Sequence, residues 1–464
     1  MMIPVPLDEV LSLAAGLEQA GRGQAAGRLA DHILAVQPNQ PAALHLKGVV
    51  TAAQGDAASA AALIEQAIRH GLEEPHYYRN ICAIYERLGR LDDALAAGRR
   101  SVQLDPTNAE SYHNLTVVHA RRLDLDRAIA CARTALRLDP SRPGAHMALA
   151  EALLTQGRFQ EGWREYEWRF RLPGAAAPLP DTDRPQWDGT EMPHDRLLLI
   201  ADQGFGDVIQ FCRYIPWVRT RCPNIAVAAG PEMQAFIRQV APDLPVFADW
   251  RHCPPYAAYC PLSGLPLRHG TDLTNIPAPI PYLSADPVRA ARWRARLEGL
   301  RPRNHRAVGL VWAGRTTHPN DRNRSARLAR IAALFSVPAT SFIALQKGPG
   351  LAEAARLFGR APLFNVSAEA NDFADTAAIL NELDLLITVD TSVAHLAGAM
   401  GRPVWLMLPH APDWRWLLNR TDSPWYPTVR LFRQAKPDDW EGVACSVAAA
   451  LMAHAPQSPV SATP

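Results

Sequence analysis

The sequence is poor in lysine, in paired cysteines and in net charge. Lysine occurs only as Lys47, Lys347 and Lys436, and the 48 basic residues nearly balance 46 acidic ones, which leaves a net charge of +2. This balance argues against nucleic acid or an anionic membrane as a general partner, so any anion-binding site must be local. The seven cysteines are scattered without a C-x-x-C pair. That spacing excludes a zinc-ligand framework and is typical of a reducing compartment.

Long apolar runs are absent as well. No stretch of about 18 apolar residues occurs, and residues 1–10 lack the basic and apolar regions of a secretory signal. We therefore expect a cytoplasmic protein without an integral membrane segment, and peripheral membrane contact stays open. The 464 residues, of which 48% are hydrophobic and 20% charged, are typical of a globular protein with two or three domains.

A 34-residue repeat occupies the first third of the chain. Its units begin at Leu7, Pro41, Pro75, Ala109 and Pro143. Small residues recur at the eighth and twentieth positions of the units: Ala14, Gly48, Cys82, Thr116 and Ala150, and then Ala26, Ala60, Ala94, Ala128 and Gly162. The period is typical of helix-turn-helix repeats, in which small side chains let two paired helices approach closely.

The pattern resembles the tetratricopeptide repeat (TPR) family over residues 7 to about 176. It predicts an α-solenoid of about five units at 1–176. The resemblance implies a concave surface that binds an extended protein or peptide partner, with a purely structural spacer as the alternative. Trp163, Tyr166, Trp168 and Phe170 are too apolar for an exposed cap. We expect these aromatic residues to dock onto the chain that follows.

Residues 177–194 are rich in proline and predict a linker. Asp181, Thr182 and Asp183 match the Asp-x-Asp pattern of metal-dependent sugar transferases, but no strand precedes them. We expect solvated acids there and no metal site.

The remaining chain alternates short apolar runs with helical stretches, such as 208–219 and 232–240, which predicts parallel sheets covered on both faces. We expect two Rossmann-like halves, at 195–303 and 304–455, and a disordered tail at 456–464. The predicted strands are 197–201, 225–229, 244–248 and 257–262 in the first half, and 307–312, 341–346, 363–366, 385–389 and 404–408 in the second. Ligands of such folds meet the carboxyl ends of the strands.

The first candidate site is the turn after strand 197–201, with Gln203, Gly204, Phe205, Gly206 and Asp207. A dinucleotide fingerprint is disfavoured because Ile209 takes its third glycine position. The glycines would let another molecule approach the backbone closely. Asp207 is either a general base for an acceptor hydroxyl or a capping residue of the next helix, and the residues alone do not separate the two.

The second candidate site follows strand 385–389 and contains Asp390, Thr391, Ser392 and His395. Thr391 or Ser392 can cap the next helix, whose free N–H groups and positive end suit a diphosphate. His395 lies one turn deeper on the same helical face and could donate a hydrogen bond to a phosphate oxygen. A structural histidine is the alternative.

Two more strand ends should converge on this edge. Trp312 and Gly314 lead into a polar loop that contains Arg324, while Gln346 and Lys347 end the next strand. Lysine is a compact charge suited to phosphate, and a solvated strand end is the alternative. The aromatic segments 413–416 and 423–427 could stack on a base or sugar, but packing is the favoured interpretation.

Together these segments resemble the glycosyltransferases of the heptosyltransferase-like kind that are coupled to TPR repeats, and more distantly the O-GlcNAc transferases. The matching stretches are 203–207, 309–314, 321–325, 345–347, 389–398, 413–416 and 425–427. Phe205 stands where the usual pattern has leucine. The resemblance implies an α + α/β protein: a TPR α-solenoid followed by a GT-B module of two Rossmann-like domains, with a nucleotide-diphosphate sugar on the second half and the acceptor on the first.

The resemblance also implies roles for individual residues. Asp207 would be the general base for inverting transfer, and Lys347 would assist the leaving group. Asp390, Thr391, Ser392 and His395 would hold nucleotide phosphate or ribose, and the donor site would also include Trp312, Gly314, Arg324, Gln346 and Lys347. The acceptor loop would consist of Gln203, Gly204, Phe205 and Gly206. Neither a metal nor a cofactor besides the sugar nucleotide would be needed.

The sequence therefore predicts a glycosyltransferase whose repeats recruit a protein or glycan acceptor. The alternative is a non-catalytic interaction protein whose transferase fold is a relic or a ligand sensor. A nucleotide-dependent oxidoreductase is disfavoured by the broken glycine fingerprint.

Overall fold

The computed structural model describes residues 6–174, 179–180, 182–277, 279–318 and 320–453. Asp181 and the predicted tail at 456–464 lie outside these ranges. The chain forms two compact units, Met1–Leu153 and Leu154–Pro464. Within the described residues, no helix combines the length and the apolar composition needed to cross a membrane.

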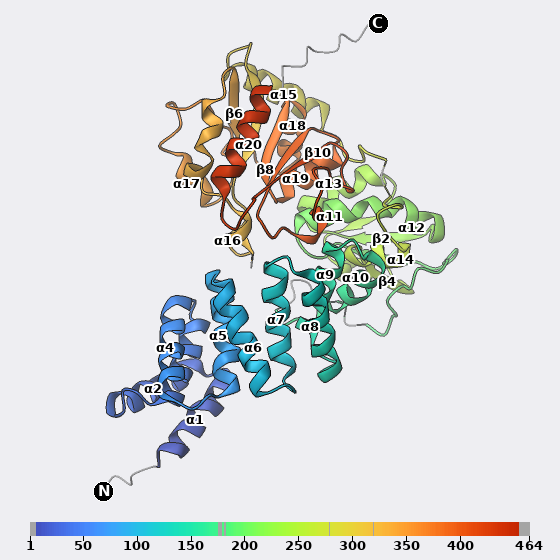
Figure 1. The fold of residues 1–464 in the computed structure, drawn as a ribbon. Helices are drawn as coiled ribbons and strands as arrows, with labels where there is room; N and C mark the ends of the chain where they lie inside the picture. Colours follow the sequence, from blue (N-terminus) through green and yellow to red (C-terminus); the bar gives the residue numbers. More distant parts are fainter. Residues whose placement is uncertain (1–5, 175–178, 181, 278, 319, 454–464) are drawn as a thin grey trace, which may run out of the picture. The chain divides into compact units, whose positions relative to one another are not determined.

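The first unit is a stack of antiparallel helix pairs (Figure 1). Its helices are α1 (Leu7–Gln19), α2 (Gly23–Val36), α3 (Pro41–Ala53), α4 (Ala57–His70), α5 (Pro75–Leu88), α6 (Leu91–Leu104), α7 (Ala109–Arg121), α8 (Leu125–Leu138) and α9 (Pro143–Thr155), the last of which runs across the division. The first helix of each pair starts at the residue that opens each predicted 34-residue unit, which confirms the repeat register.

The small residues of the repeat lie where helices approach most closely. A Cβ atom at Gly48 would lie 2.5 Å from Ile64 Cγ1, and one at Gly162 would lie 2.7 Å from Leu154 Cδ2. Ala60, at the twentieth position of its unit, is fully buried. Larger side chains at these positions would hold the helices apart, as the sequence pattern predicts.

The second unit begins with α10 (Phe159–Tyr166) and the 3-10 helix η1 (Glu167–Arg171), followed by two parallel sheets. One sheet has the order β3-β2-β1-β4, and the other has the order β10-β9-β8-β5-β6-β7. The strands are β1 (Leu197–Ile200), β2 (Ile225–Ala228), β3 (Val246–Phe247), β4 (Ala258–Pro261), β5 (Arg306–Val311), β6 (Thr340–Ala344), β7 (Leu363–Asn365), β8 (Leu385–Val389), β9 (Val404–Leu408) and β10 (Val429–Arg433). The expected parallel α/β elements are therefore present.

Short helices connect and cover the strands (Figure 1). The α-helices are α11 (Phe205–Phe211), α12 (Ile215–Arg221), α13 (Pro231–Val240), α14 (Leu265–His269), α15 (Pro287–Glu298), α16 (Asp321–Arg324), α17 (Gly350–Ala354), α18 (Phe373–Asn381), α19 (Ser392–Ala399) and α20 (Trp440–Ala453). The 3-10 helices are η2 (Cys212–Tyr214), η3 (Trp250–His252), η4 (Leu262–Gly264), η5 (Leu328–Ser336) and η6 (Trp414–Trp416).

Three features differ from the sequence expectations. The helix predicted over 208–219 is two helices, α11 and α12, joined by η2, and Pro216 lies in the first turn of α12, where its missing N–H is tolerated. Strand β10 was not predicted; it lies at the edge of its sheet, and its five residues, VRLFR, include two arginines that interrupt the apolar run. Helix α15, inside the range expected for the first half, packs against α18 of the second sheet through pairs such as Arg294–Glu382.

The predicted linker is anchored where the structure describes it. Trp187 is buried, its backbone N–H donates to Tyr259 O at 2.7 Å, and its indole N–H donates to Thr190 O at 2.8 Å. The proline pattern had predicted an irregular path, but it gave no signal that one tryptophan fastens this segment to the first sheet.

Candidate functional site

The candidate site lies where loops from both sheets meet, at the carboxyl ends of β1 and β8. The turn after β1 leads into α11, and the turn after β8 leads into α19. These two helices pack together at Gly206: a Cβ atom there would lie 2.9 Å from His395 Cδ2 and 3.6 Å from Ser392 Cα. The two predicted sites are therefore one site. The space beside Gly206, which the sequence suggested for a bound molecule, is filled by His395 of the same chain.

Asp207 closes the first turn of α11. Its Oδ2 atom accepts a hydrogen bond from the Gly204 backbone N–H at 3.0 Å, which completes a capping arrangement at the helix start. Its Oδ1 atom forms an ion pair with the guanidinium of Arg415. A carboxylate offers about four acceptor positions, so these two contacts leave room for a further donor. The capping interpretation of Asp207 is confirmed.

Arg415 is a charged residue of the candidate site that was not among the predicted site residues. It lies in η6, in a segment for which packing was the favoured prediction, and it is 8% exposed. Besides Asp207, it binds Gln210 Oε1 through Nε at 2.6 Å and Asp413 Oδ1 through Nη1 at 2.9 Å. No spacing rule joins Arg415 to Asp207 because 208 positions separate them. Two signals pointed to its segment: a charged residue within an aromatic run, and the family resemblance of 413–416.

His395 and Asp390 form a buried polar pair at the start of α19. His395 Nε2 lies 3.8 Å from Asp390 Oδ1, and its Nδ1 lies 3.0 Å from the Tyr426 hydroxyl. Burial lowers the pKa of His395 well below its usual value, and Arg415 lowers it further. His395 is therefore a neutral imidazole, which suits hydrogen bonding rather than charge pairing with phosphate.

The pKa of Asp390 moves in the opposite direction. Burial, with the nearby Asp413 carboxylate as a second cause, raises it to about 6, against the opposing effects of Trp416, Arg415 and Arg324. The site therefore carries a carboxyl group that changes its charge near neutral pH. Such perturbed groups concentrate at functional sites, although structural clusters also produce them.

The N-terminus of α19 has no side-chain cap. Thr391 occupies the capping position in an extended conformation, but no cap hydrogen bond forms. Its hydroxyl lies 3.2 Å from the hydroxyl of Thr388 instead. The helix itself begins at Ser392. Because the first N–H groups of a helix need acceptors from outside it, this end suits an oxyanion ligand.

Gln346 and Trp312 prove to be internal. Gln346 Oε1 accepts from the backbone N–H groups of Trp312 and Ala313 at 3.0 and 2.9 Å, and its Nε2 donates to Ala313 O and Lys347 O. This amide therefore ties the end of β6 to the end of β5. The Trp312 side chain is fully buried in the core of the second sheet.

Gly314 and Arg324 face each other across the polar loop after β5. A Cβ atom at Gly314 would lie 2.8 Å from Arg324 Cζ, so the guanidinium lies directly against the backbone of this glycine. Arg324 pairs weakly with Asp321, at 3.5 Å, and its buried Nε has no hydrogen-bond partner among the described residues. Arg324 is thus a cation with capacity for another acceptor.

Lys347 is exposed at the carboxyl end of β6, and its Nζ donates a hydrogen bond to Ala370 O. Gln203, in the other sheet's turn, is exposed and has a φ of 67°, a left-handed conformation that is uncommon outside glycine. Phe205 packs edge-on against Phe373 at 5.1 Å between ring centroids. Gln203 belongs to the turn that leads into α11 and Phe205 is the first residue of that helix, whereas Gly206 and His395 form the α11–α19 contact.

The aromatic segments pack, as predicted. Trp414, Trp416, Trp425 and Tyr426 are buried. Trp163 of α10 meets Trp414 edge-on at 5.1 Å, and its indole N–H donates to Thr271 O at 3.1 Å. The aromatic residues of α10 therefore dock onto the α/β fold.

Comparisons with known proteins bear mainly on the repeats. A tetratricopeptide repeat family model matches residues 45–109 and 118–166, and the N-terminal helices are TPR repeats. Over 97% of its length, the chain is 26% identical to the protein FlbA of Caulobacter vibrioides, of which it covers 73%.

Solved structures match about a third of the chain. MamA is 17% identical, with 36% of this chain and 94% of that chain covered and a TM-score of 0.31. The protein TTC0263 of Thermus thermophilus is described as a thermophilic TPR protein. It is 25% identical, with 34% of this chain and 88% of that chain covered and a TM-score of 0.31.

Proposed function

We propose that the second unit is a glycosyltransferase that uses a nucleotide-diphosphate sugar, and that the TPR array binds the protein or peptide that carries or presents the acceptor. The family resemblance of the motifs motivates the chemistry. The observation that carries the proposal is the close packing of Gly206, the residue before Asp207, against Ser392 and His395 at the uncapped N-terminus of α19. The two turns come from different sheets and lie more than 180 residues apart in the sequence.

In the proposed reaction, the first sheet supplies the base that activates the acceptor, and the second sheet supplies the groups that bind the donor. Asp207 removes the proton of an acceptor hydroxyl, and the acceptor oxygen attacks the anomeric carbon. The bond from that carbon to the diphosphate breaks, so the nucleoside diphosphate leaves and the configuration inverts. Asp207 is suited to this role because its two internal contacts leave acceptor positions unused.

The second sheet supplies the groups that would stabilise the leaving diphosphate. The N-terminus of α19 presents backbone N–H groups, and the Nε of Arg324, which lies 3.5 Å from Asp321 Oδ1, makes no hydrogen bond among the described residues. Lys347 is exposed at the neighbouring strand end and would reach the ligand by exchanging its contact with Ala370 O. His395, held neutral, would donate one hydrogen bond rather than add charge.

The TPR repeats support the recruitment part of the proposal. Such arrays mediate protein–protein interaction through the surface that their stacked first helices form. Polar contacts join successive first helices in the array: Asn80 Nδ2 lies 2.9 Å from His45 Nε2, and Asn114 Nδ2 donates to Arg79 O at 3.1 Å. These side chains make the first-helix face of the array a polar surface suited to a peptide.

The test begins with binding. Purified full-length protein is screened by thermal shift against UDP, GDP, ADP and CDP and the corresponding sugar nucleotides. A ligand that binds only the folded state stabilises by about 2.7 kcal/mol at a hundredfold excess over Kd. We expect one nucleotide family to stabilise the protein. Lys347→Ala and His395→Ala should lose the shift, and Lys47→Ala, in the other unit, should keep it.

Asp207→Asn separates binding from transfer. This variant should keep the thermal shift and lose sugar transfer, because Asp207 lies on the acceptor side. Unimpaired transfer by Asp207→Asn would remove the base assignment. If no nucleotide stabilises the wild-type protein at millimolar concentration, the non-catalytic interaction protein becomes the better account of the chain.

A further inference from the structure

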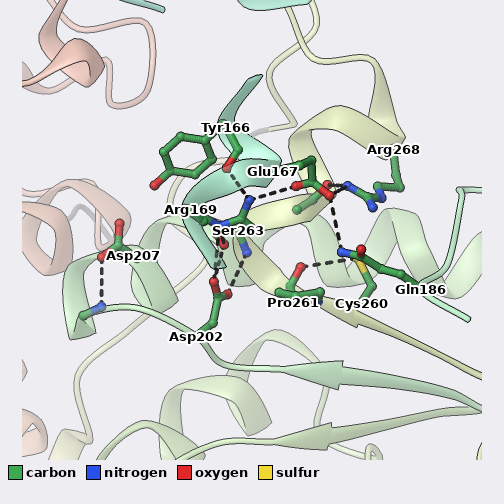
Figure 2. A network of polar contacts seen from close by, with 12 residues as sticks. Tyr166, Glu167, Arg169, Gln186, Asp202, Asp207, Cys260, Pro261, Ser263 and Arg268 are labelled. Carbon is green, nitrogen blue, oxygen red and sulfur yellow. Dashed lines mark hydrogen bonds and ion pairs between the residues drawn. The ribbon is translucent and has the colours of Figure 1, made fainter. Parts of the chain in front are cut away.

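A network of ionic and hydrogen-bonding side chains lies next to the turn that carries Asp207 (Figure 2). At its centre is Arg169 of η1, which is 3% exposed. Its Nη1 donates to Glu167 Oε1 at 2.8 Å and to Tyr166 O at 2.9 Å, and its Nε donates to Ser263 Oγ at 2.9 Å. Through this guanidinium, η1 contacts Ser263 in η4, directly after strand β4 of the first sheet.

Ser263, in turn, forms two hydrogen bonds with Asp202. The Ser263 backbone N–H donates to Asp202 Oδ1 at 3.0 Å, and the Ser263 hydroxyl donates to Asp202 Oδ2 (Figure 2). Arg169 Nε itself lies 3.7 Å from Asp202 Oδ2. The carboxylate of Asp202 is therefore held from two directions, with its charge facing a guanidinium.

Burial of this pair is costly, which suggests a role beyond stability. Asp202 is 2% exposed, and Arg169 Nη2 is buried without a hydrogen-bond partner among the described residues. Buried ion pairs often stabilise less than well-packed apolar side chains of the same volume. What they can supply is a single fixed arrangement of the groups around them.

The group that Asp202 fixes is the turn that carries Asp207. Gln203 follows directly in its left-handed conformation, which persists only when the surrounding structure enforces it. Gly204 comes next, and its N–H donates to Asp207 Oδ2 at 3.0 Å. Hydrogen bonds therefore link Arg169 to Ser263 and Ser263 to Asp202. The backbone of residues 202–204 then leads to Gly204, whose N–H binds the carboxylate of Asp207.

Residues 163–169 also contact the segment that carries Arg415, the ion-pair partner of Asp207. Trp163 and Tyr166 lie 5.1 and 6.1 Å from Trp414, measured between ring centroids. The guanidinium of Arg415 stacks on that Trp414 ring at 4.2 Å and pairs with Asp207. Both contacts that hold the Asp207 carboxylate thus lead back to residues 163–169.

We propose that Arg169 is a positioning residue for Asp207, so that the segment after the last TPR repeat is part of the catalytic framework. The role of Asp207 as base rests on the function proposed above; the ordering of its turn by Arg169 does not. Arg169 acts through Ser263 and Asp202 and touches no reacting atom.

The experiment measures the turn and the reaction separately in the full-length protein. Amide hydrogen exchange of peptides covering 201–211 is compared in wild type, Arg169→Gln and Ser263→Ala. Ser263→Ala removes the linking hydroxyl with little change in volume, so it remains informative if Arg169→Gln fails to fold. Arg268→Gln is the matched control, because Arg268 belongs to the same network but binds Glu167, Gly264 and Trp187.

We expect Arg169→Gln and Ser263→Ala to exchange about tenfold faster in this peptide, with unchanged exchange in α19, and Arg268→Gln to resemble wild type. Transfer by the first two variants should fall in kcat, on the order of 10²-fold, at unchanged donor KM. Wild-type exchange at 201–211 in both variants would overturn the proposal. Faster exchange in a protein without transferase activity would uphold the positioning role and refute the proposed function.

Discussion

Gly206 and His395 pack so closely that a single methyl group would separate them. The Cβ atom of an alanine at position 206 would lie 2.9 Å from His395 Cδ2, a distance that Cβ atoms do not adopt in folded proteins. This contact joins the helix that follows β1 of one sheet to the helix that follows β8 of the other. The two candidate sites found in the sequence therefore form one site.

The first prediction follows from this contact. Gly206→Ala should destabilise the second unit by about 1–3 kcal/mol, because the rigid imidazole and the backbone of Ser392 leave no room for a methyl group. All twelve tryptophans lie after position 160, so urea unfolding followed by tryptophan fluorescence reports on the second unit alone. Gly204→Ala is the control: its Cβ would meet only Asp207 Oδ2, at 3.3 Å, and should cost much less.

The repeat array offers a second matched pair of glycines. Gly48→Ala should destabilise the array by about 1–3 kcal/mol because the new Cβ would meet Ile64 at 2.5 Å. Gly16 lies inside α1 with no atom within 4 Å of the added Cβ. Gly16→Ala should therefore stabilise the array by up to about 1 kcal/mol through helix propensity. Circular dichroism of the purified variants during thermal unfolding gives both signs, and equal effects would contradict the packing argument.

Arg415 should be important for stability as well as for the proposed chemistry. Arg415→Met removes a buried cation from Asp207, Asp413 and Gln210, and we expect a loss of about 3 kcal/mol in fluorescence-monitored unfolding. Adding Asp207→Asn should recover part of that loss, because the unpaired carboxylate is then gone. Additive effects of the two substitutions would show that the ion pair contributes no coupling energy.

Asp390 gives the protein a predictable pH dependence. Its folded pKa of about 6 lies above the ordinary value of 3.8, so the folded state binds a proton more tightly than the unfolded state. The stability that this proton contributes is fully present below about pH 4 and is lost as the pH rises through 6. Asp390→Asn has no such group to ionise.

The difference between wild type and Asp390→Asn should therefore change with pH. From pH 4 to pH 7, Asp390→Asn should gain up to about 3 kcal/mol relative to wild type, the free energy that corresponds to the shift of about two pKa units. Urea unfolding at several pH values, followed by fluorescence, measures this difference. A constant difference across the range would show that Asp390 titrates at its ordinary value.

Much of the fold could be read from periodicity. The repeat register located the first helix of every pair because each 34-residue unit carries its own helix start and its own small residues. The apolar runs located nine of the strands because buried parallel strands need continuous apolar sequence. Edge strand β10 was missed, since Arg430 and Arg433 interrupt its apolar sequence and remove that signal.

The individual sites were less completely predicted. Spacing placed Asp207, Asp390 and His395 at strand ends, since the chain order of strand, turn and helix is local. Spacing could not show that His395 fills the space beside Gly206. Nor could it show that the Gln346 amide hydrogen-bonds the ends of two strands, or that the Lys347 amine donates to Ala370 O. Those outcomes depend on side chains that meet across long stretches of sequence.

By itself, the sequence determined the repeat register, the order of strands and helices, and the chemical types available at the strand ends, because each depends on residues within about one repeat. Only the tertiary structure decided that Arg415 pairs with Asp207 and that Arg169 stands behind the same turn. Both arginines lie in segments whose local pattern indicates aromatic packing. A buried guanidinium is costly unless a carboxylate lies beside it. Which carboxylate does so depends on the tertiary fold and not on the neighbouring sequence.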